Sequence, residues 1–417
     1  MNFISPSTIE GALPAPSSKS SLQRLIAASF LADGKSELTD VSLCRDSMAA
    51  LQIIRDLGAE VISDPPILRI TSHRHFRLSQ LDCGESGLCL RMFAPILSLF
   101  DHPFTLTGEG SLITRPATML EEPLHALGVN CRTNGGMLPV SLHGPMRPGQ
   151  IEIDGSISSQ FLSGLLMALP LLDGDSIITV RNLKSKPYID LTLAILADFG
   201  IRIPATDYKT FRIPGRQSYR PGRYRVEGDW SGAAFLLVAG AVAGRITVSN
   251  LDLHSTQGDR VILQALESAG ARIEIGSEHI TISRDRLEGF EFNAEECPDL
   301  FPPLAVLACA CHGLSRIAGV ERLIHKESNR AVALQTELSR LGASITIEGN
   351  RMLIRGGGLD GGELDSHNDH RIAMAGAIAA LISRRGVTIR HPECIAKSYP
   401  GFFTDLAAIT PTAGDPQ

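Results

Sequence analysis

The sequence predicts a two-domain α/β protein built from six repeated α/β units, three per domain, with buried helices. Its 417 residues exceed the length that one hydrophobic core usually covers, so two domains are expected. An apolar helical pattern recurs six times along the chain. A glycine that can end a helix recurs in steps of 70, 72, 70 and 72 residues, at Gly58, Gly128, Gly200, Gly270 and Gly342.

The segment Pro16–Val61 shows the pattern of one repeat. A loop rich in hydroxyls and cations leads into a helical pattern over Leu25–Ala32, which is followed by a strand over Glu37–Val41. A second helical pattern over Met48–Leu57 stops at the first of the glycines, and a strand starts at Ala59. Each repeat therefore reads helix, strand, helix and two strands.

The first helix of each repeat is apolar nearly all round, which is typical of a buried helix, whereas the second helix carries a polar face, as in Val332–Leu338. The first helices are expected at Leu25–Ala32, Arg91–Phe100, Phe161–Leu172, Ala233–Ala243, Pro303–His312 and Ile372–Ser383. The strands after the helix-ending glycines are expected at Ala59–Ile62, Val129–Cys131, Ile201–Ile203, Ala271–Ile275 and Ala343–Ile347.

The sixth repeat lacks its final strands, because the chain passes from Ala407–Ile409 into a tail rich in Pro and Gly. The spare β-like segment Phe3–Ile9 can supply them, which would return the N-terminus to the domain that holds the last three repeats. Domain one is therefore predicted as residues 1–18 with 228–417, and domain two as residues 19–227. The chain would cross between the domains twice, near Ser18 and near Glu227–Asp229. The active site is expected in the cleft between the domains.

The composition excludes several classes of function. A formal net charge of −6 argues against a general nucleic-acid-binding protein, which would carry a basic excess. No apolar run reaches the roughly 18 residues of a membrane span without Gly or a charge. The N-terminus lacks the basic and apolar regions of a signal peptide. We therefore expect a cytoplasmic protein with no nucleic-acid or membrane partner.

Neither the cysteines nor the histidines indicate a metal site. The eight cysteines form no C-x-x-C pair, so reduced and mostly buried thiols are predicted. His367 and His370 are spaced to share one face of a helix, but the zinc motif H-E-x-x-H also needs a glutamate that is absent here. A structural role is favoured for both histidines, and no metal or organic cofactor is predicted.

Cations and hydroxyls gather where the helices are expected to begin, and the N-termini of equivalent helices should lie together on one face of each domain. Lys19 and Arg24 flank such an N-terminus, where the peptide dipoles disfavour a cation by a few tenths to about 1 kcal/mol. Ser and Asp there can be ordinary N-caps, but caps do not account for the cations. The pattern predicts a multiply anionic ligand. Asp299 and Glu327, isolated carboxylates among cations, are candidate acid and base groups.

Eight short motifs are spread from the first loop of the chain to the last. They are Pro16-x-Ser18-Lys19-Ser20-x-x-x-Arg24, Gly84-x-x-Gly87-x-x-x-Arg91, Arg115-Pro116, Ser158-Ser159-Gln160-Phe161-Leu162, Ser185-Lys186-Pro187-Tyr188, Lys326-Glu327-Ser328-x-Arg330, Asn368-Asp369-His370-Arg371-x-Ala373-Met374 and Ala396-Lys397-Ser398. In order and spacing they resemble the EPSP synthase family, the 5-enolpyruvylshikimate-3-phosphate synthases. Each motif alone is weak, but eight in register are specific.

The resemblance implies the two-domain enolpyruvyl transferase fold, which closes on its substrates. It also implies transfer of the enolpyruvyl group of phosphoenolpyruvate (PEP) to the 5-hydroxyl of shikimate 3-phosphate. The products would be EPSP and phosphate, formed through a tetrahedral intermediate without a metal or organic cofactor. These small molecules would be the only partners, and a monomer is expected.

The resemblance also implies roles for individual residues. Shikimate 3-phosphate would be held by Lys19, Ser20, Arg24, Ser158, Ser159, Ser185, Asp299 and Lys326. PEP would be held by Lys19, Gly87, Arg115, Gln160, Arg330, Arg371 and Lys397. Asp299 would take the proton of the attacking hydroxyl. Glu327, with Lys19 nearby, would serve the protonation of the PEP methylene carbon.

The chain departs from the family pattern at four positions. Glu85 and Leu88 stand where Asn and Thr are usual, Met92 stands where Pro is usual, and Arg322 replaces an Asn that helps to bind shikimate 3-phosphate. The retained Gly87 lets a ligand approach the backbone, so glyphosate, which occupies the PEP site in this family, should still enter. Leu88 and Met92 nevertheless predict reduced glyphosate sensitivity.

Two alternatives remain open from the sequence. UDP-N-acetylglucosamine enolpyruvyl transferase shares the fold and PEP, but it uses a cysteine in a loop that corresponds to Gly110–Arg115, which has none here. A non-catalytic anion-binding scaffold would have lost Lys19, Asp299 or Glu327, and all three are present.

Overall fold

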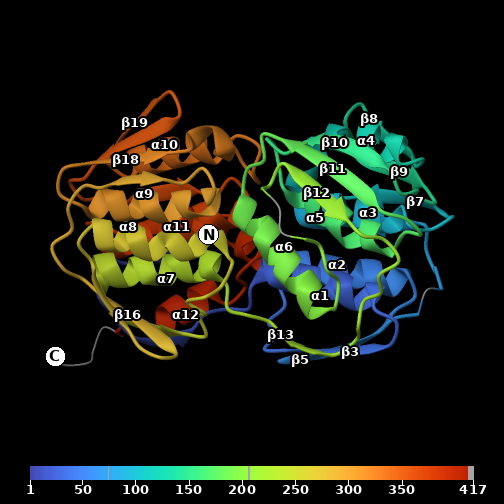
Figure 1. The fold of residues 1–417 in the computed structure, drawn as a ribbon. Coiled ribbons are helices and arrows are strands. Elements are labelled where there is room, and N and C mark those ends of the chain that lie inside the picture. The colour runs from blue at the N-terminus through green and yellow to red at the C-terminus, as the bar shows by residue number, and fades with distance from the viewer. Residues whose placement is uncertain (74, 205–206, 412–417) are drawn as a thin grey trace. The chain divides into compact units, whose positions relative to one another are not determined.

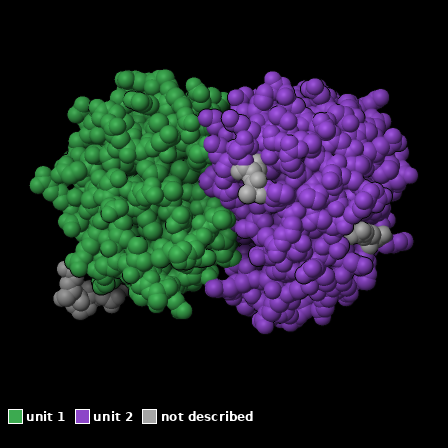
Figure 2. All heavy atoms as spheres, in the orientation of Figure 1, with its two compact units in different colours: residues 1–18, 227–417 green, residues 19–226 purple. Residues whose placement is uncertain are grey.

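The computed structural model describes residues 1–73, 75–204 and 207–411 (Figure 1). The chain divides into two compact units, which Figure 2 shows in different colours. Unit 1 comprises residues 1–18 and 227–417, and unit 2 comprises residues 19–226. Most of the Pro/Gly tail expected after Ile409 lies outside the described residues. Within the described part of the chain, each unit contains three β-sheets and three of the six repeats.

Unit 2 holds the first three repeats. Its helices are α1 (Lys19–Leu31), α2 (Arg45–Asp56), α3 (Gly87–Leu97), α4 (Glu121–Ala126), α5 (Gln160–Ala168) and α6 (Lys186–Asp198), with 3₁₀ turns η1 (Gly110–Thr114), η2 (Thr118–Leu120) and η3 (Leu169–Leu171). One sheet has the order β13 (Arg223–Arg225), β3 (Lys35–Thr39), β5 (Ile67–Thr71), β4 (Glu60–Asp64). The second has the order β6 (Gln80–Asp82), β7 (Pro103–Thr107), β9 (Met137–His143), β8 (Asn130–Asn134), and the third β10 (Gln150–Asp154), β11 (Ser176–Arg181), β12 (Thr210–Ile213).

Unit 1 holds the last three repeats and the N-terminal strands. Its helices are α7 (Trp230–Ala243), α8 (Ile262–Ser268), α9 (Phe301–Ala310), α10 (Arg330–Arg340), α11 (His370–Ile382) and α12 (Phe402–Ala408), with 3₁₀ turns η4 (Gly258–Val261), η5 (Pro298–Leu300), η6 (Val320–Leu323) and η7 (Pro392–Lys397). The sheets have the orders β15 (Arg272–Ile275), β16 (His279–Ser283), β14 (Gly244–Ser249), β2 (Ile9–Pro14); β17 (Glu291–Asn293), β18 (Leu314–Ala318), β20 (Arg351–Arg355), β19 (Ser344–Glu348); and β1 (Asn2–Ile4), β22 (Val387–Arg390), β21 (Gly362–Asp365).

The first helices of the repeats form the core of each unit, as their all-round apolar pattern predicts. In unit 1, α7, α9 and α11 pack against one another side by side (Figure 1). All fourteen residues of α7 are buried. In unit 2, α3 packs on α5 at Gly164, where an added Cβ would lie 2.6 Å from the carbonyl oxygen of Met92. Each fully buried Leu or Phe in these cores contributes about 1.5–3 kcal/mol.

The five helix-ending glycines have the conformation that their periodicity predicts. Their φ angles are 100°, 84°, 85°, 87° and 102°, in the left-handed region that other residues avoid. Strands follow four of them, at β4, β8, β15 and β19. The strand expected at Ile201–Ile203 is wrong. The Gln217 side chain accepts a hydrogen bond from the Arg202 N–H (2.7 Å) and donates to the Arg202 carbonyl (3.0 Å), so this backbone is satisfied without a strand partner.

Several first helices begin earlier than their apolar pattern indicates. α1 begins at Lys19 and α3 at Gly87, whereas the apolar pattern starts at Leu25 and Arg91. In α3 the helix begins before Arg91 because Ser86 caps it, with its Oγ accepting the Cys89 N–H. In α1 the pattern fails because the first turns carry polar side chains that are buried. Arg24, for example, lies inside α1 and is only 1% exposed.

The N-terminal segment belongs to unit 1. As expected, β1 completes the sheet of the sixth repeat by pairing antiparallel with β22. The prediction missed a second pairing, because Ile9 starts β2, which runs parallel to β14 of the fourth repeat.

An exchange of strands explains how both units close. In four repeats, the strand before the first helix pairs parallel with the strand after it: β6 with β7, β10 with β11, β17 with β18, and β21 with β22. Where the chain passes from one unit to the other, β2 instead pairs with β14, and β13 pairs with β3. The crossing segments bond to each other, since Ser18 N–H donates to the Glu227 carbonyl (2.8 Å) and Asp229 N–H to the Pro16 carbonyl (2.7 Å).

Candidate active site

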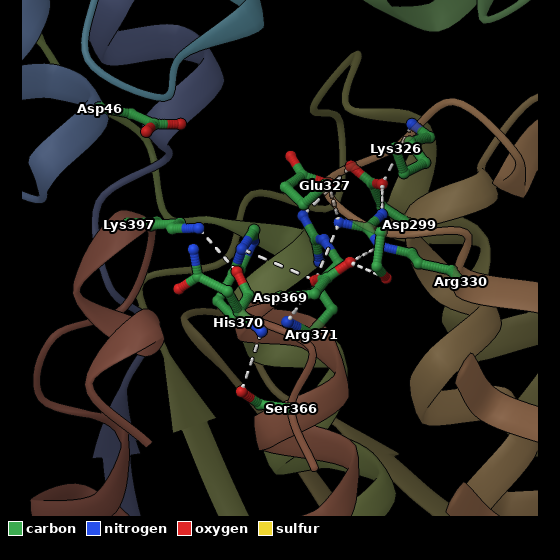
Figure 3. A network of polar contacts seen from close by, with 12 residues as sticks. Asp46, Asp299, Lys326, Glu327, Arg330, Ser366, Asp369, His370, Arg371 and Lys397 are labelled. Atoms are coloured by element: carbon green, nitrogen blue, oxygen red, sulfur yellow. Dashed lines mark hydrogen bonds and ion pairs between the residues drawn. The ribbon is translucent and has the colours of Figure 1, made fainter. Parts of the chain in front are cut away.

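In unit 1, the starts of η5, α10 and α11 and the loop before α10 bring charged side chains into one network (Figure 3). Asp299 lies in η5, ahead of α9, and its carboxylate accepts hydrogen bonds from three cations. These are Arg330 Nη1 at 2.7 Å and Lys326 Nζ at 3.3 Å, both to Oδ1, and Arg371 Nη2 at 3.1 Å to Oδ2. The sequence expectation that equivalent helix starts meet is therefore confirmed within this unit.

Arg330 is the centre of the network and is 1% exposed. It is the first residue of α10, and its guanidinium donates to Asp299, to Glu327 Oε2 and to both carboxylate oxygens of Asp369 (2.8 and 3.3 Å). Burial by itself lowers the pKa of Arg330, but Asp369, Glu327 and Asp299 outweigh it and raise the pKa. The arginine is therefore permanently charged.

Asp369 has two structural roles in the same place. It is the N-cap of α11, where its Oδ1 accepts the Arg371 N–H at 3.0 Å, and its Oδ2 accepts from Ser328 Oγ at 3.0 Å. Because it also accepts from Arg330, one fully buried carboxylate fixes the start of α11 and the guanidinium of α10 together.

The pKa of Asp299 is set by opposing effects. Burial raises the pKa of its carboxyl, but Arg371, Lys326 and Arg330 together lower it well below its usual value. The pKa of Lys326 is lowered, chiefly because burial disfavours the charged amine, while Asp299 raises it in part. Asp299 is thus an ionised carboxylate whose basicity depends on how much of the surrounding positive charge is neutralised.

Two further residues complete the unit 1 cluster. Lys397, at the end of η7, is 2% exposed and its Nζ donates to the Asn368 carbonyl at 2.6 Å. Asp259 in η4 is 1% exposed and accepts from Ser231 Oγ, at the start of α7. Burial, with Asp299 next, raises the pKa of Asp259 to about 7, and Arg371 partly opposes this. The start of α7 therefore joins the cluster through Asp259.

In unit 2, Lys19 is the first residue of α1 and its Nζ lies 3.0 Å from Asp46 Oδ2, in the first turn of α2. Both side chains are mostly buried, at 14% and 12% exposure. Asp46 therefore orients Lys19 and balances its charge at the helix N-terminus. This partner was not predicted, because an acidic residue in a first helical turn looks like an ordinary complement of the helix dipole.

Arg24 is held by the interior of unit 2. Its guanidinium donates to Thr192 Oγ1 (2.8 Å), Ser163 Oγ (3.2 Å) and the Ser20 carbonyl (2.8 Å). Burial lowers the pKa of Arg24 to about 10, so it stays charged at neutral pH. Thr192 and Ser163 were not anticipated, because hydroxyls on apolar helices carry no distinctive sequence signal.

Gly87, Arg115 and Gln160 converge at the start of α3. A Cβ added to Gly87 would lie 2.9 Å from Arg115 Nη1, 3.0 Å from Arg91 Nη1 and 3.5 Å from Gln160 Oε1. Arg91 organises the group, because its Nη1 donates to Gln160 Oε1 (2.9 Å) and its Nη2 to the Pro116 carbonyl (3.0 Å). The sequence motif contained Arg91, but its positioning role became visible only in three dimensions.

The predicted serines all lie at helix starts in unit 2. Ser20 is in the first turn of α1, and Ser159 is the N-cap of α5. Ser158 Oγ accepts the Gln160 N–H at 3.2 Å. Ser185 precedes α6 with a left-handed backbone (φ 57°). Hydroxyls and free backbone N–H groups at helix starts suit phosphate oxygens.

The cysteines and histidines have structural positions. All eight cysteines are free and buried, as predicted. His367 Nε2 lies 2.9 Å from Glu337 Oε1, and His370 is buried at the start of α11. Among residues 1–73, 75–204 and 207–411, no helix has the length and apolar content needed to cross a bilayer.

Comparisons with known proteins agree over nearly the whole chain. The family described as "EPSP synthase (3-phosphoshikimate 1-carboxyvinyltransferase)" matches residues 4–406. A 3-phosphoshikimate 1-carboxyvinyltransferase of Clostridium novyi (strain NT) is 37% identical over 97% of this chain and 96% of its own length. One of Clostridium perfringens (strain ATCC 13124) is 40% identical over 98% of this chain and 97% of its own length.

Solved structures show the same fold. An EPSP synthase from Acinetobacter baumannii superposes with a TM-score of 0.81 at 27% identity, covering 97% of this chain and 96% of that one. The enolpyruvyl transferase NikO from Streptomyces tendae shares the fold with a TM-score of 0.79 at 19% identity, covering 98% of this chain and 97% of that one. The chain therefore belongs to the EPSP synthase family and transfers the enolpyruvyl group of PEP to the 5-hydroxyl of shikimate 3-phosphate.

Proposed function

We propose that the residues identified from the sequence perform this reaction in the following roles. Shikimate 3-phosphate is held by Lys19, Ser20, Arg24, Ser158, Ser159, Ser185, Asp299 and Lys326. PEP is held by Lys19, Gly87, Arg115, Gln160, Arg330, Arg371 and Lys397. Each set contains residues of both units, so we propose that each substrate bridges domain one and domain two, as expected for an active site in an interdomain cleft.

The observation that carries the proposal is the position of Asp299 among three cations. A carboxylate with a strongly lowered pKa is a weak base. Phosphate and carboxylate groups of the substrates would neutralise Arg371, Lys326 and Arg330, and this would raise the pKa of Asp299. Asp299 thus becomes basic enough to take the proton of the 5-hydroxyl only when the substrates are bound.

Anionic substrates would also compete for Arg330. In the structure, the guanidinium of Arg330 donates to Asp299 and Glu327 as well as to Asp369. The carboxylate of PEP would replace Glu327 and Asp299 as acceptors, while Asp369, which is fully buried, stays in place. Binding would therefore release the two proposed acid and base groups for the reaction.

The proton balance follows from these roles. In the addition step, the 5-oxygen bonds to C2 of PEP, Asp299 takes the hydroxyl proton, and Glu327, with Lys19 nearby, delivers a proton to the methylene carbon C3. In the elimination step, the bond between C2 and the phosphate oxygen breaks, and the leaving phosphate takes the proton that Asp299 holds. Glu327, deprotonated by the addition step, takes a proton from C3, which restores the double bond and completes the product. Exclusion of water by bound substrate strengthens each charged contact.

Substitution of Asp299 tests the assignment. Asp299→Asn keeps the shape of the side chain but removes the base, so turnover should fall by about 10²–10⁴-fold, while the dissociation constant for shikimate 3-phosphate changes far less. Asp285→Asn, at an exposed position of the same unit, is the control and should keep full turnover. A near-normal rate in Asp299→Asn would place the base elsewhere, with Glu327 next to be tested.

A binding experiment tests the proposal that residues of both units bind PEP. PEP should bind weakly alone and strongly once shikimate 3-phosphate is present, because its ligands are divided between Arg115 and Gln160 of unit 2 and Arg330, Arg371 and Lys397 of unit 1. Calorimetric titration of PEP with and without shikimate 3-phosphate measures the difference. Equal affinities would contradict the proposal.

We also propose that the protein is a monomer and that it is located in the cytoplasm. Sedimentation analysis checks the monomeric state.

A further inference from the structure

We propose that Glu85 is a positioning residue for PEP binding: its carboxylate fixes the turn that carries Arg115. This inference rests on the proposed role of Arg115 as a PEP ligand. Glu85 lies in the loop before α3, and its Oε2 accepts the backbone N–H of Ser111 at 2.9 Å. Ser111 belongs to η1, and Arg115 is the residue at which η1 ends.

The backbone of η1 is shaped around this carboxylate. Gly110 has φ 53°, in the left-handed region, and a Cβ at this position would overlap the Glu85 carboxylate. A glycine at this position therefore leaves room for the Glu85 side chain as well as permitting the turn. Leu112, in the middle of the same turn, is fully buried and anchors the turn from its other side.

Besides the hydrogen bond from Ser111, other hydrogen bonds also join the two PEP-binding segments of unit 2. The Glu109 N–H donates to the Gly84 carbonyl at 2.9 Å, on the N-terminal side of the turn. Arg91 Nη2 donates to the Pro116 carbonyl at 3.0 Å, on its C-terminal side. Glu85 supplies the link between these two. The segment that carries Gly87 and the segment that carries Arg115 are therefore joined as one piece.

The geometry at Gly87 shows why the link between these two segments matters for PEP binding. Arg115 Nη1 lies only 2.9 Å from the place of a Cβ on Gly87, so a shift of η1 moves the guanidinium directly against, or away from, the Gly87 backbone. PEP needs the Arg115 guanidinium and the Gly87 backbone to keep their positions relative to each other. A misplacement of about 1 Å is enough to weaken binding or catalysis strongly.

A glutamate suits this task better than the asparagine that the family pattern leads us to expect here. A carboxylate makes a charge-assisted hydrogen bond to a backbone N–H, roughly twice as strong as a neutral one. Its additional methylene also extends the reach from the loop to η1.

Three variants at position 85 test the proposal by steady-state kinetics. Glu85→Ala should raise the KM for PEP about tenfold, with kcat and the KM for shikimate 3-phosphate within twofold of the unaltered chain. Glu85→Gln keeps the length and an acceptor oxygen, so it should restore the KM for PEP to within about threefold. Glu85→Asn, one methylene shorter, should behave like Glu85→Ala. Glu60→Ala, at an exposed acidic side chain of β4 in the same unit, is the matched control and should leave both KM values and kcat unchanged.

Several results would overturn the proposal. They are equal KM values for PEP in Glu85→Ala and the unaltered chain, an equal rise in both KM values, or no rescue by Glu85→Gln. Arg115→Met separates this failure from failure of the proposed function. If Arg115→Met leaves the KM for PEP unchanged, the assignment of Arg115 itself is wrong. If only Arg115→Met raises it, the assignment stands and the role of Glu85 is wrong.

A double-mutant cycle provides a second measurement, and Glu85→Asn takes the place of Glu85→Ala in the cycle if Glu85→Ala folds poorly. Gly110→Ala pushes the Glu85 carboxylate away, so it should raise the KM for PEP in the unaltered chain. In the Glu85→Ala background the overlap is gone, and the same substitution should have a smaller effect. Additive effects of the two substitutions on the KM for PEP would show that residues 85 and 110 act independently, which would contradict the proposal.

Discussion

Asp369 and Arg330 form an ion pair from which water is almost entirely excluded, with side-chain exposures of 0% and 1% and a shortest contact of 2.8 Å. Removing Asp369 takes two hydrogen bonds from the buried guanidinium of Arg330 and the N-cap from α11, and Asp299 and Glu327 compensate the charge only in part. We therefore expect Asp369→Ala to lower the free energy of unfolding by about 3–5 kcal/mol.

The exposed pair of Arg384 and Asp360 in the same unit is the control for this prediction. Their side chains are 80% and 56% exposed, so Asp360→Ala should cost less than about 1 kcal/mol. Denaturant unfolding measures both variants. Equal costs would mean that burial does not govern the Asp369–Arg330 pair.

Asp259 gives a prediction for the pH dependence of stability. Its pKa is raised to about 7 in the folded chain and is near 4 in the unfolded chain, so its contribution to stability is fully present below about pH 4 and is lost as pH rises to about 7. Asp259→Asn removes this dependence. The variant should therefore gain stability relative to the unaltered chain between pH 5 and pH 8.

Besides burial, the charged and polar groups around Asp259 set its pKa. Asp299 and Asp229 raise its pKa, Arg371 and the Ser231 hydroxyl lower it, and the buried thiol of Cys297 lies within its field. Unfolding free energies of both chains at pH 5, 6, 7 and 8 give the difference directly. A difference that stays constant over this range would show that Asp259 does not titrate there.

Gly87→Ala tests the close approach at the start of α3. The added Cβ would lie 2.9 Å from Arg115 Nη1, so the guanidinium must move and the KM for PEP should rise about tenfold. Gly357→Ala is the matched control, because its Cβ would meet nothing within 4 Å. Steady-state kinetics with PEP checks both. An unchanged KM in Gly87→Ala would mean that Arg115 relocates freely.

Glyphosate sensitivity tests the departures at Leu88 and Met92. Both side chains are buried on α3, at 7% and 0% exposure, so they can displace the helix turn that presents Gly87. We expect reduced glyphosate sensitivity with near-normal use of PEP. The double variant Leu88→Thr/Met92→Pro should restore sensitivity. The measure is the ratio of the glyphosate inhibition constant to the KM for PEP, and an unchanged ratio would contradict the idea.

The periodic features of the sequence predicted most of the fold. Helix-ending glycines and all-round apolar helices recur because every repeat packs its first helix in the same way. The end of a helix at Gly128 or Gly342 can therefore be predicted from the neighbouring residues alone. The strand expected after Gly200 was wrong because Gln217, a residue 17 positions away, satisfies that backbone. The start of α1 was misplaced because buried polar side chains such as Arg24 obscure an apolar pattern, and the start of α3 was misplaced because the N-cap Ser86 was not recognised.

Part of the candidate site, too, was predictable from the sequence and part was not. Residues within motifs, such as Asp299 and Arg330, were found because spacing along the chain preserves them. Partners that meet only through the fold could not be found by spacing. Asp46 lies 27 positions from Lys19, and Asp259 lies 28 positions from Ser231, which bonds to it, so neither carries a local signal.

The exchange of β2 and β13 has a consequence for the order in which the chain folds during synthesis. Unit 2 is complete at Val226, because β13 supplies the last strand of its sheet with β3. β1 cannot pair until β22 has been synthesised, because Ile4 pairs with Val387, which lies 383 residues later in the chain. At about 5–20 residues per second, this wait lasts on the order of 20–80 s. The first strand to leave the ribosome is therefore among the last to find its place, and unit 2 can fold while unit 1 still lacks residues 227–417.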